Sequence, residues 1–99
     1  MSGLTQLRKA AKGMECQIRI PGICNFNTET TVLGHYRLPG ICGTGIKPID
    51  LIGSWSCYAC HDAVDGRSKT AFKHDALRLM HAEGCLRTIN ELIKRGLII

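Results

Sequence analysis

The stretch "GSWSCYACHDAVDGR", residues 53 to 67, sets two cysteines two residues apart and places a histidine directly after them. A C-x2-C pair can be half of a zinc site, a redox pair or half of a disulfide framework. The surrounding pattern predicts that Cys57 ends a strand and that Cys60 begins a helix. Which chemistry this junction serves depends on the other cysteines in the chain.

Four of the six cysteines fall into two pairs, because Cys16 and Cys24 flank the turn "QIRIPGI". Structural zinc sites hold four ligands in a tetrahedron, which a hairpin and a helix N-terminus can supply two by two. We therefore predict a structural Zn²⁺ bound by Cys16, Cys24, Cys57 and Cys60. The alternative is that Cys16 and Cys24 are merely buried while Cys57 and Cys60 form a redox pair, although the thioredoxin-like βαβ context for such a pair is missing.

The two remaining cysteines have different interpretations. Cys42 lies in the glycine-rich loop at residues 39–48, which could reach a metal. It is therefore the alternative ligand if one cysteine of the quartet does not bind the zinc. Cys85 lies near the apolar stripe of a predicted helix, and we interpret it as a core residue.

Length and charge narrow the class of protein. A chain of 99 residues is predicted to form one domain, residues 1–99. A core of that size is only modestly stable, and a bound metal would stabilise it. A secretory leader and a membrane-length apolar run are both missing, so we expect a cytoplasmic protein with reduced thiols. Thirteen Lys and Arg residues against eight Asp and Glu give a net charge of +5, which favours a polyanionic partner.

The remaining patterns predict a small α+β fold. Residues 4–12 favour a short basic helix that ends at Gly13, and residues 15–20, "ECQIRI", alternate as a strand does. Residues 30–38 are predicted to form the returning strand. Residues 75–95 are predicted to form a long helix whose apolar stripe buries against the sheet. The stripe consists of Leu79, Ala82, Leu86, Ile89 and Ile93.

The order of "VLGHYR", "PIDLI" and "CYACHD" resembles the HNH, or His-Me finger, endonucleases in their zinc-containing treble-clef form. Within that group, "ECQIRIPGIC" and "CGTGIKP" resemble a family of small prophage-encoded nucleases. The resemblance implies a zinc-stapled treble-clef, or ββα-metal, domain with a short N-terminal and a long C-terminal helix. It also implies a DNA endonuclease that hydrolyses phosphodiesters with Mg²⁺ or another divalent ion, in phage DNA metabolism or recombination.

The resemblance implies roles for three residues, which can be checked against the chemistry of hydrolysis. His35 would be the general base, His61 would bind the catalytic divalent ion, and Asp50 would orient an imidazole. Many members carry an acidic metal ligand immediately before the base histidine, and here that position is Gly34. Asp62 or Asp65 could supply the missing carboxylate.

Several basic residues could contact backbone phosphates, which fix the position of a nucleic acid without reading its sequence. Those near the proposed site are Arg37, Lys47, Arg67 and Lys69, and a second contact could come from Arg8, Lys9 and Lys12. Solvated surface charge is the alternative for each of them. Trp55 is predicted to be buried, and His74 and His81 are interpreted as ordinary helix residues.

Two other functions are consistent with the sequence. The same fold could be a non-catalytic zinc module that binds nucleic acid, which the glycine at position 34 favours. A zinc-stapled adaptor for protein interactions is the third hypothesis. It differs from the other two in predicting no salt-sensitive binding to DNA.

Overall fold

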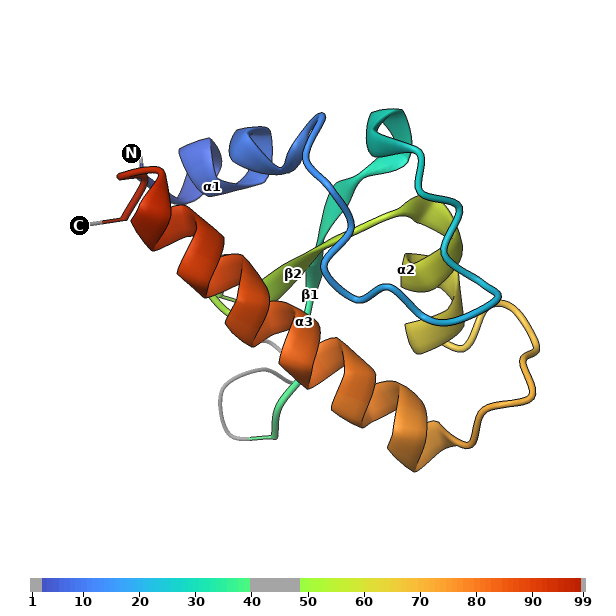
Figure 1. Cartoon of the computed structure of the whole chain (residues 1–99). Coiled ribbons are helices and arrows are strands. Elements are labelled where there is room, and N and C mark those ends of the chain that lie inside the picture. The colour runs from blue at the N-terminus through green and yellow to red at the C-terminus, as the bar shows by residue number, and fades with distance from the viewer. Residues whose placement is uncertain (1–2, 40–48, 99) are drawn as a thin grey trace.

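A two-stranded antiparallel sheet lies at the centre of the computed structural model, which describes residues 3–39 and 49–98 (Figure 1). In chain order the elements are α1 (Gly3–Ala11), the 3-10 helix η1 (Thr28–Thr30), β1 (Val32–His35), β2 (Gly53–Ser56), α2 (Tyr58–Val64) and α3 (His74–Lys94). The strands pair from Val32 opposite Ser56 to His35 opposite Gly53. The chain is therefore a small α+β protein in which a hairpin leads directly into a short helix.

Helix α3 packs across β2 and supports the sheet (Figure 1). Trp55 of β2 is 1 % exposed, so its predicted burial is confirmed. The backbone N–H of Trp55 donates to Thr88 Oγ1 at 2.9 Å, and the Thr88 hydroxyl donates to the Gly84 carbonyl at 2.8 Å. Two short strands alone are marginal in water, so these contacts from α3 are what keep the hairpin folded.

Both terminal helices agree with the prediction. The helix expected at residues 4–12 is α1, and it is followed by Gly13 at a φ of 81°, the left-handed conformation that favours glycine. The helix expected at residues 75–95 is α3. Neither of them, nor any other helix in the described ranges, has the length and apolar character needed to cross a bilayer.

The strand predicted at residues 15–20 is wrong. This segment, which we call the knuckle (residues 15–24), forms no strand, and Arg19 within it has a φ of 53°. Six extended residues would span about 20 Å. The knuckle curls instead, which lets its two cysteines approach each other. The predicted strand at residues 30–38 is shorter than expected, and it pairs with β2 rather than with the knuckle.

The predicted buried stripe of α3 is also wrong, because its main members face solvent. Leu79 is 60 % exposed, Leu86 66 % and Ile93 48 %. The buried residues of α3 are His81, Gly84, Cys85, Thr88 and Leu92. This face lies inward because the sheet and the knuckle offer backbone groups that need hydrogen-bond partners. His81 and Thr88 supply such partners, and Gly84 has no side chain to keep the helix away.

Two buried clusters form the core. One surrounds the knuckle and α2 and consists of Cys16, Ile18, Ile20, Cys57, Cys60 and Ala63. The other joins α1 to the end of α3 and consists of Leu7, Ala11, Trp55 and Leu92. Three of the six residues in the first cluster are cysteines, so its cohesion depends on what the sulfur atoms bind.

Replacing Gly84 with alanine tests the close approach of α3 to the knuckle. A Cβ at position 84 would lie 2.9 Å from Ile18 Cγ1 and 3.2 Å from Ile18 Cα. We expect Gly84→Ala to lower the free energy of unfolding by about 1–3 kcal/mol, although alanine is the better helix former.

The matched control is Asn90→Ala on the exposed side of α3, which should stabilise by a few tenths of a kcal/mol. Urea unfolding followed by circular dichroism measures both changes. A gain in stability for Gly84→Ala similar to that for Asn90→Ala would contradict the close contact.

Candidate metal centre and histidine–aspartate site

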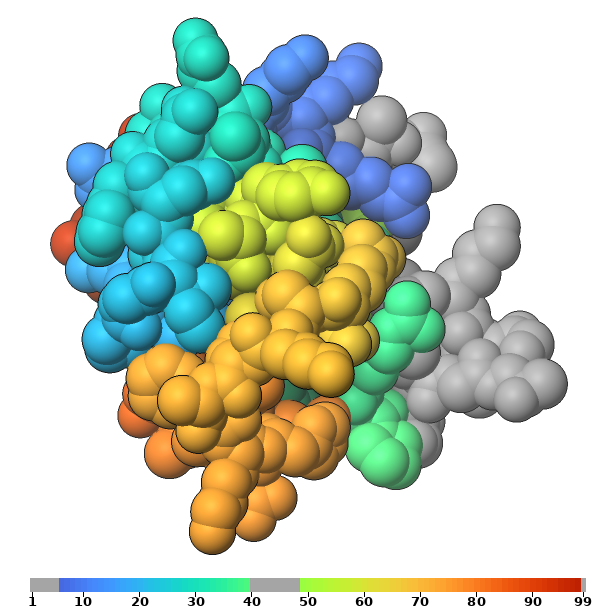
Figure 2. All heavy atoms as spheres, turned by 90° about the vertical axis from the view of Figure 1, so that its right-hand side faces the viewer, coloured from blue at the N-terminus to red at the C-terminus, as the bar shows by residue number. Residues whose placement is uncertain are grey.

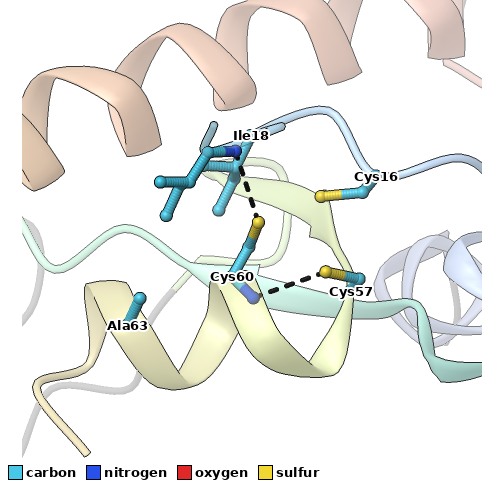
Figure 3. Close-up of a cluster of buried hydrophobic side chains, with 6 residues drawn as sticks. Cys16, Ile18, Cys57, Cys60 and Ala63 are labelled. Carbon is cyan, nitrogen blue, oxygen red and sulfur yellow. Dashed lines mark hydrogen bonds between the residues drawn. The ribbon is translucent and has the colours of Figure 1, made fainter. Parts of the chain in front are cut away.

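The four cysteines predicted as a quartet come together in one cluster. Figure 3 shows three of them, Cys16, Cys57 and Cys60. Their sulfur atoms all lie within 4.8 Å of one another, and the sulfur atoms of Cys24 and Cys57 are 3.8 Å apart. A tetrahedral metal with metal–sulfur bonds of about 2.3 Å requires sulfur–sulfur distances of about 3.8 Å. The spacing therefore fits a single metal ion at the centre of the cluster.

Local backbone geometry positions the sulfur atoms. Cys57 is the N-cap of α2, and its sulfur accepts the N–H of Cys60 at 3.4 Å. On the knuckle side, the N–H of Arg19 donates to Cys16 Sγ and the N–H of Ile20 donates to Cys60 Sγ, each at 3.5 Å. Backbone N–H groups aimed at sulfur stabilise thiolates, the form in which cysteine binds metals.

The pKa shifts of the thiols favour a cation at the centre of the cluster. The neighbouring Cys60 thiol, assisted by backbone N–H groups, lowers the pKa of Cys16 to about 4. Burial raises the pKa of Cys24 to about 11, and the hydrogen bond to Cys16 followed by burial raises that of Cys60. One thiolate thus suppresses ionisation of its neighbours, and a bound metal ion removes that conflict. The quartet can bind a metal ion.

Of the other two cysteines, the structure describes only Cys85, which lies outside this cluster. Cys85 is buried on the inner face of α3, as predicted, and burial raises the pKa of its thiol to about 11. Cys42, the predicted substitute ligand, lies outside the described residues.

A second cluster joins three segments at the end of β1. His35 Nε2 donates to Asp50 Oδ1 at 2.6 Å. Arg8 of α1 donates from Nε to the same oxygen at 3.0 Å, and its Nε lies 2.9 Å from Asp50 Oδ2. Burial raises the pKa of Asp50, but the hydrogen bonds from His35 and Arg8 outweigh it and hold that pKa below its usual value. Asp50 therefore stays ionised and fixes the proton of His35 on Nε2, which leaves Nδ1 as a proton acceptor.

His61 stands on α2 beside this end of β1. A Cβ built on Gly34 would lie 2.9 Å from His61 Cδ2 and 2.6 Å from Ser56 Oγ, so only glycine fits at position 34. His61 Nε2 lies 3.4 Å from Asp65 Oδ2, one helical turn later. The structure thus brings His61 against the residue that precedes His35, and it excludes an acidic side chain there for a steric reason.

A cleft of about 360 Å³ opens between the end of β1, the end of α2 and the start of α3. On the face shown in Figure 2, the segment after β1 lies beside α2 and the start of α3. The cleft is lined by His35, Tyr36, Arg37, Val64, Asp65, Arg67, His74, Arg78 and His81. Most of the polar side chains in this lining are cationic or histidine, so the cleft suits an anion.

Only some of the basic residues predicted to contact phosphates line this cleft. Arg37 and Arg67 line it, whereas Lys69 is exposed outside it and Lys47 lies outside the described residues. Arg67 also approaches Asp62 at 3.5 Å and Asp65 at 3.3 Å. Arg8 was grouped with Lys9 and Lys12 as a second phosphate contact, but its guanidinium binds Asp50.

Three cleft residues were missed by sequence reasoning. Arg78 lies over the Tyr36 ring at 4.6 Å from its centroid, and His74 begins α3. His81 is buried, donates from Nε2 to the Gly34 carbonyl at 3.0 Å, and has its pKa lowered chiefly by burial. The spacing of His81, Cys85, Thr88 and Leu92 is also helical, and it is the signal that would have identified the inner face.

These features define a small α+β protein in which a four-cysteine metal-binding cluster lies beside a histidine–aspartate pair. The chain belongs to the YbcO family: the family model described as "Putative nuclease YbcO" matches residues 5–97. The protein of that name from Escherichia coli K12 is 50 % identical over 95 residues, covering 96 % of this chain and 98 % of its own. The same identity and coverage apply to "Putative nuclease ybcO" of Enterobacteria phage 82.

A solved structure from the same bacterium has the same fold. It is described as the "Structure of a putative bacteriophage protein from Escherichia coli str. K-12 substr. MG1655". It shares 44 % sequence identity with this chain, and the superposition has a TM-score of 0.78. The match covers 92 % of this chain and all of that one, so the likeness extends across the whole fold.

The four-cysteine cluster predicts a stoichiometric metal. Purified protein should contain one tightly bound metal ion per chain, and Cys57→Ser should lose it together with most of the folded state, because binding energy at such a site is folding energy. Cys85→Ala is the matched control, since it removes a buried cysteine outside the cluster. Elemental analysis and thermal melting measure both effects. A well-folded Cys57→Ser protein without metal would contradict the structural role.

Proposed function

We propose that this protein is a divalent-metal-dependent DNA endonuclease of the HNH, or His-Me finger, type with a structural zinc. The observation that carries the proposal is the contact of 2.6 Å between His35 Nε2 and Asp50 Oδ1, with His61 packed against the preceding residue. The names of the relatives, "Putative nuclease YbcO" and "Putative nuclease ybcO", support the same class of activity.

Zinc is the metal that the cysteine quartet favours. Four sulfur ligands in a tetrahedron are typical of structural zinc. The order of the elements supports a treble-clef assignment, because the knuckle supplies Cys16 and Cys24, and the junction from the hairpin to α2 supplies Cys57 and Cys60. In this role the metal would fix the start of α2, and with it His61.

His35 is the proposed general base. Its Nε2–H is held by Asp50, so Nδ1 is free to take a proton from a water molecule that attacks phosphorus. The ionised carboxylate also stabilises the imidazolium that forms when the proton arrives. Arg8 keeps the carboxylate ionised and oriented, which makes it a positioning residue rather than a catalytic one.

His61 and Asp65 are the proposed ligands of the catalytic ion, Mg²⁺ or another divalent metal. A divalent ion bound there would polarise the phosphate and stabilise the leaving oxygen. The side chains stand one helical turn apart, with His61 Nε2 at 3.4 Å from Asp65 Oδ2. Asp65 would supply the carboxylate that Gly34 lacks, and Arg67 lies 3.3 Å from that carboxylate.

DNA is the proposed substrate, bound through its backbone. Arg37, Arg67 and Arg78 line the cleft next to His35, and the chain carries a net charge of +5. Phosphate oxygens accept the paired N–H donors of arginine well. Lys47 and Lys69 remain proposed contacts with DNA phosphates. The cytoplasm remains the expected compartment.

A non-catalytic nucleic-acid-binding module is the second candidate. It is favoured by one observation: Asp65 lies 3.3 Å from Arg67, so this carboxylate is neutralised by a cation of the protein itself. Both candidates bind DNA, and they differ only in whether the bond is cut. A protein-interaction adaptor would bind no DNA.

Removing the proposed base separates the two candidates. His35→Ala should reduce cleavage of plasmid DNA in Mg²⁺ or Mn²⁺ by roughly 100-fold or more, because a positioned base contributes at least that much. Its metal content, melting temperature and DNA affinity should match those of the parent. If the parent never cuts DNA with any divalent ion, or if His35→Ala cuts as well as the parent, the protein is the binding module instead.

Salt dependence tests the binding surface and the adaptor hypothesis. Affinity for duplex DNA should fall steeply with salt, and Arg37→Ala should reduce the slope of log affinity against log salt by about one phosphate contact. Lys94→Ala, an exposed basic residue at the far end of α3, is the matched control and should leave the slope unchanged. An affinity that does not respond to salt would favour the adaptor.

A further inference from the structure

The outer face of α3 carries a row of apolar side chains that the fold leaves exposed. Leu79, Leu86 and Ile93 are 60 %, 66 % and 48 % exposed and follow one another at intervals of seven residues. Ala82 and Ile89 lie between them and are partly buried. The combined spacing of three and four residues is that of the a and d positions of a coiled coil. Single exposed apolar residues are common, but a heptad row along a whole helix is a surface that packs against another helix.

We propose that this row, Leu79 to Ile93, pairs with the same row of a second copy of this chain. The two α3 helices would run antiparallel about a two-fold axis that passes beside Leu86. A two-fold interface is self-complementary, so each residue meets a partner determined by the symmetry. Leu86 then faces Leu86 of the other copy, and Leu79 faces Ile93. This inference does not depend on the proposed nuclease activity.

Charge complementarity selects a second copy in the antiparallel orientation. Glu83 is exposed and forms no ion pair with the described part of the chain. With the axis beside Leu86, Glu83 of one copy lies next to Arg87 of the other, on both sides of the central leucine pair. The guanidinium of Arg87 is already held in place by the carbonyls of Gln17 and Ile18, at 2.8 and 3.4 Å. Antiparallel helices also oppose their dipoles favourably.

The pairing would leave the cleft accessible. His74, Arg78 and His81 contribute to the cleft, and His81 lies on the inner face of α3. At 100° per residue, Leu79 points about 160° away from His81. A dimer formed through the outer face would therefore carry two independent clefts. Because the interface consists of one helix from each copy, it belongs to the smaller class of specific interfaces, and the dimer should depend on concentration.

Sedimentation equilibrium of the intact protein from about 1 to about 500 µM tests the proposal, since small interfaces dissociate in that range. The parent should shift from monomer to dimer as concentration rises. Leu86→Glu should raise the dissociation constant roughly 100-fold or more, because it brings two like charges together in an apolar contact. Leu79→Glu is a second variant with the same expectation, and both should retain the fold, because the side chains are exposed.

The matched control is Tyr58→Glu, which changes an equally exposed aromatic residue on α2 and should leave dimerisation unchanged. Glu83→Arg should weaken the dimer about tenfold by placing a cation beside Arg87. Metal content and circular dichroism confirm that each variant is folded. A parent that stays monomeric throughout the range would overturn the proposal. The proposal would also be overturned if the Leu86→Glu and Leu79→Glu proteins dimerise like the parent. Unchanged association of the Glu83→Arg protein would overturn the antiparallel arrangement.

Discussion

The cluster of four cysteine sulfurs is the contact on which the rest of the structure depends. It joins the knuckle, which has no regular secondary structure, to the first turn of α2. Without a cation these sulfurs conflict, since the pKa of Cys16 is lowered while those of Cys24 and Cys60 are raised. A cation would fix where α2 begins, and His61, the residue directly after Cys60, lies against β1. A structural metal at this cluster would thereby determine the position of a candidate catalytic side chain.

Polar contacts from α3 complete the frame. His81 holds the Gly34 carbonyl, Thr88 holds the Trp55 N–H, and Arg87 holds two carbonyls of the knuckle. Each contact satisfies a backbone group of an element too short or too irregular to satisfy it alone. The helix therefore orders the sheet and the knuckle through specific hydrogen bonds as much as through apolar area. Gly34, whose carbonyl accepts from His81, has no room for a side chain because a Cβ would meet Ser56 Oγ and His61 Cδ2.

Part of this arrangement could be predicted from the sequence, because local signals carry it. The spacing of the cysteines predicted the quartet, and Gly13 predicted the end of α1. The knuckle could not be predicted, since "ECQIRI" alternates like a strand and only the need to bring Cys16 near Cys24 bends it. The inner face of α3 was misassigned because the more apolar of its two helical stripes was taken to be the buried one. Arg8 and Asp50 are 42 residues apart, and no local pattern links them.

We propose that a tetrahedral four-sulfur zinc site organises the fold around the histidine–aspartate site. X-ray absorption at the zinc edge of the purified protein measures the ligands of the metal directly. We expect four sulfur neighbours of the zinc ion at about 2.3 Å. A spectrum with nitrogen or oxygen neighbours in place of two or more sulfurs, or a folded protein with no zinc edge at all, would contradict it.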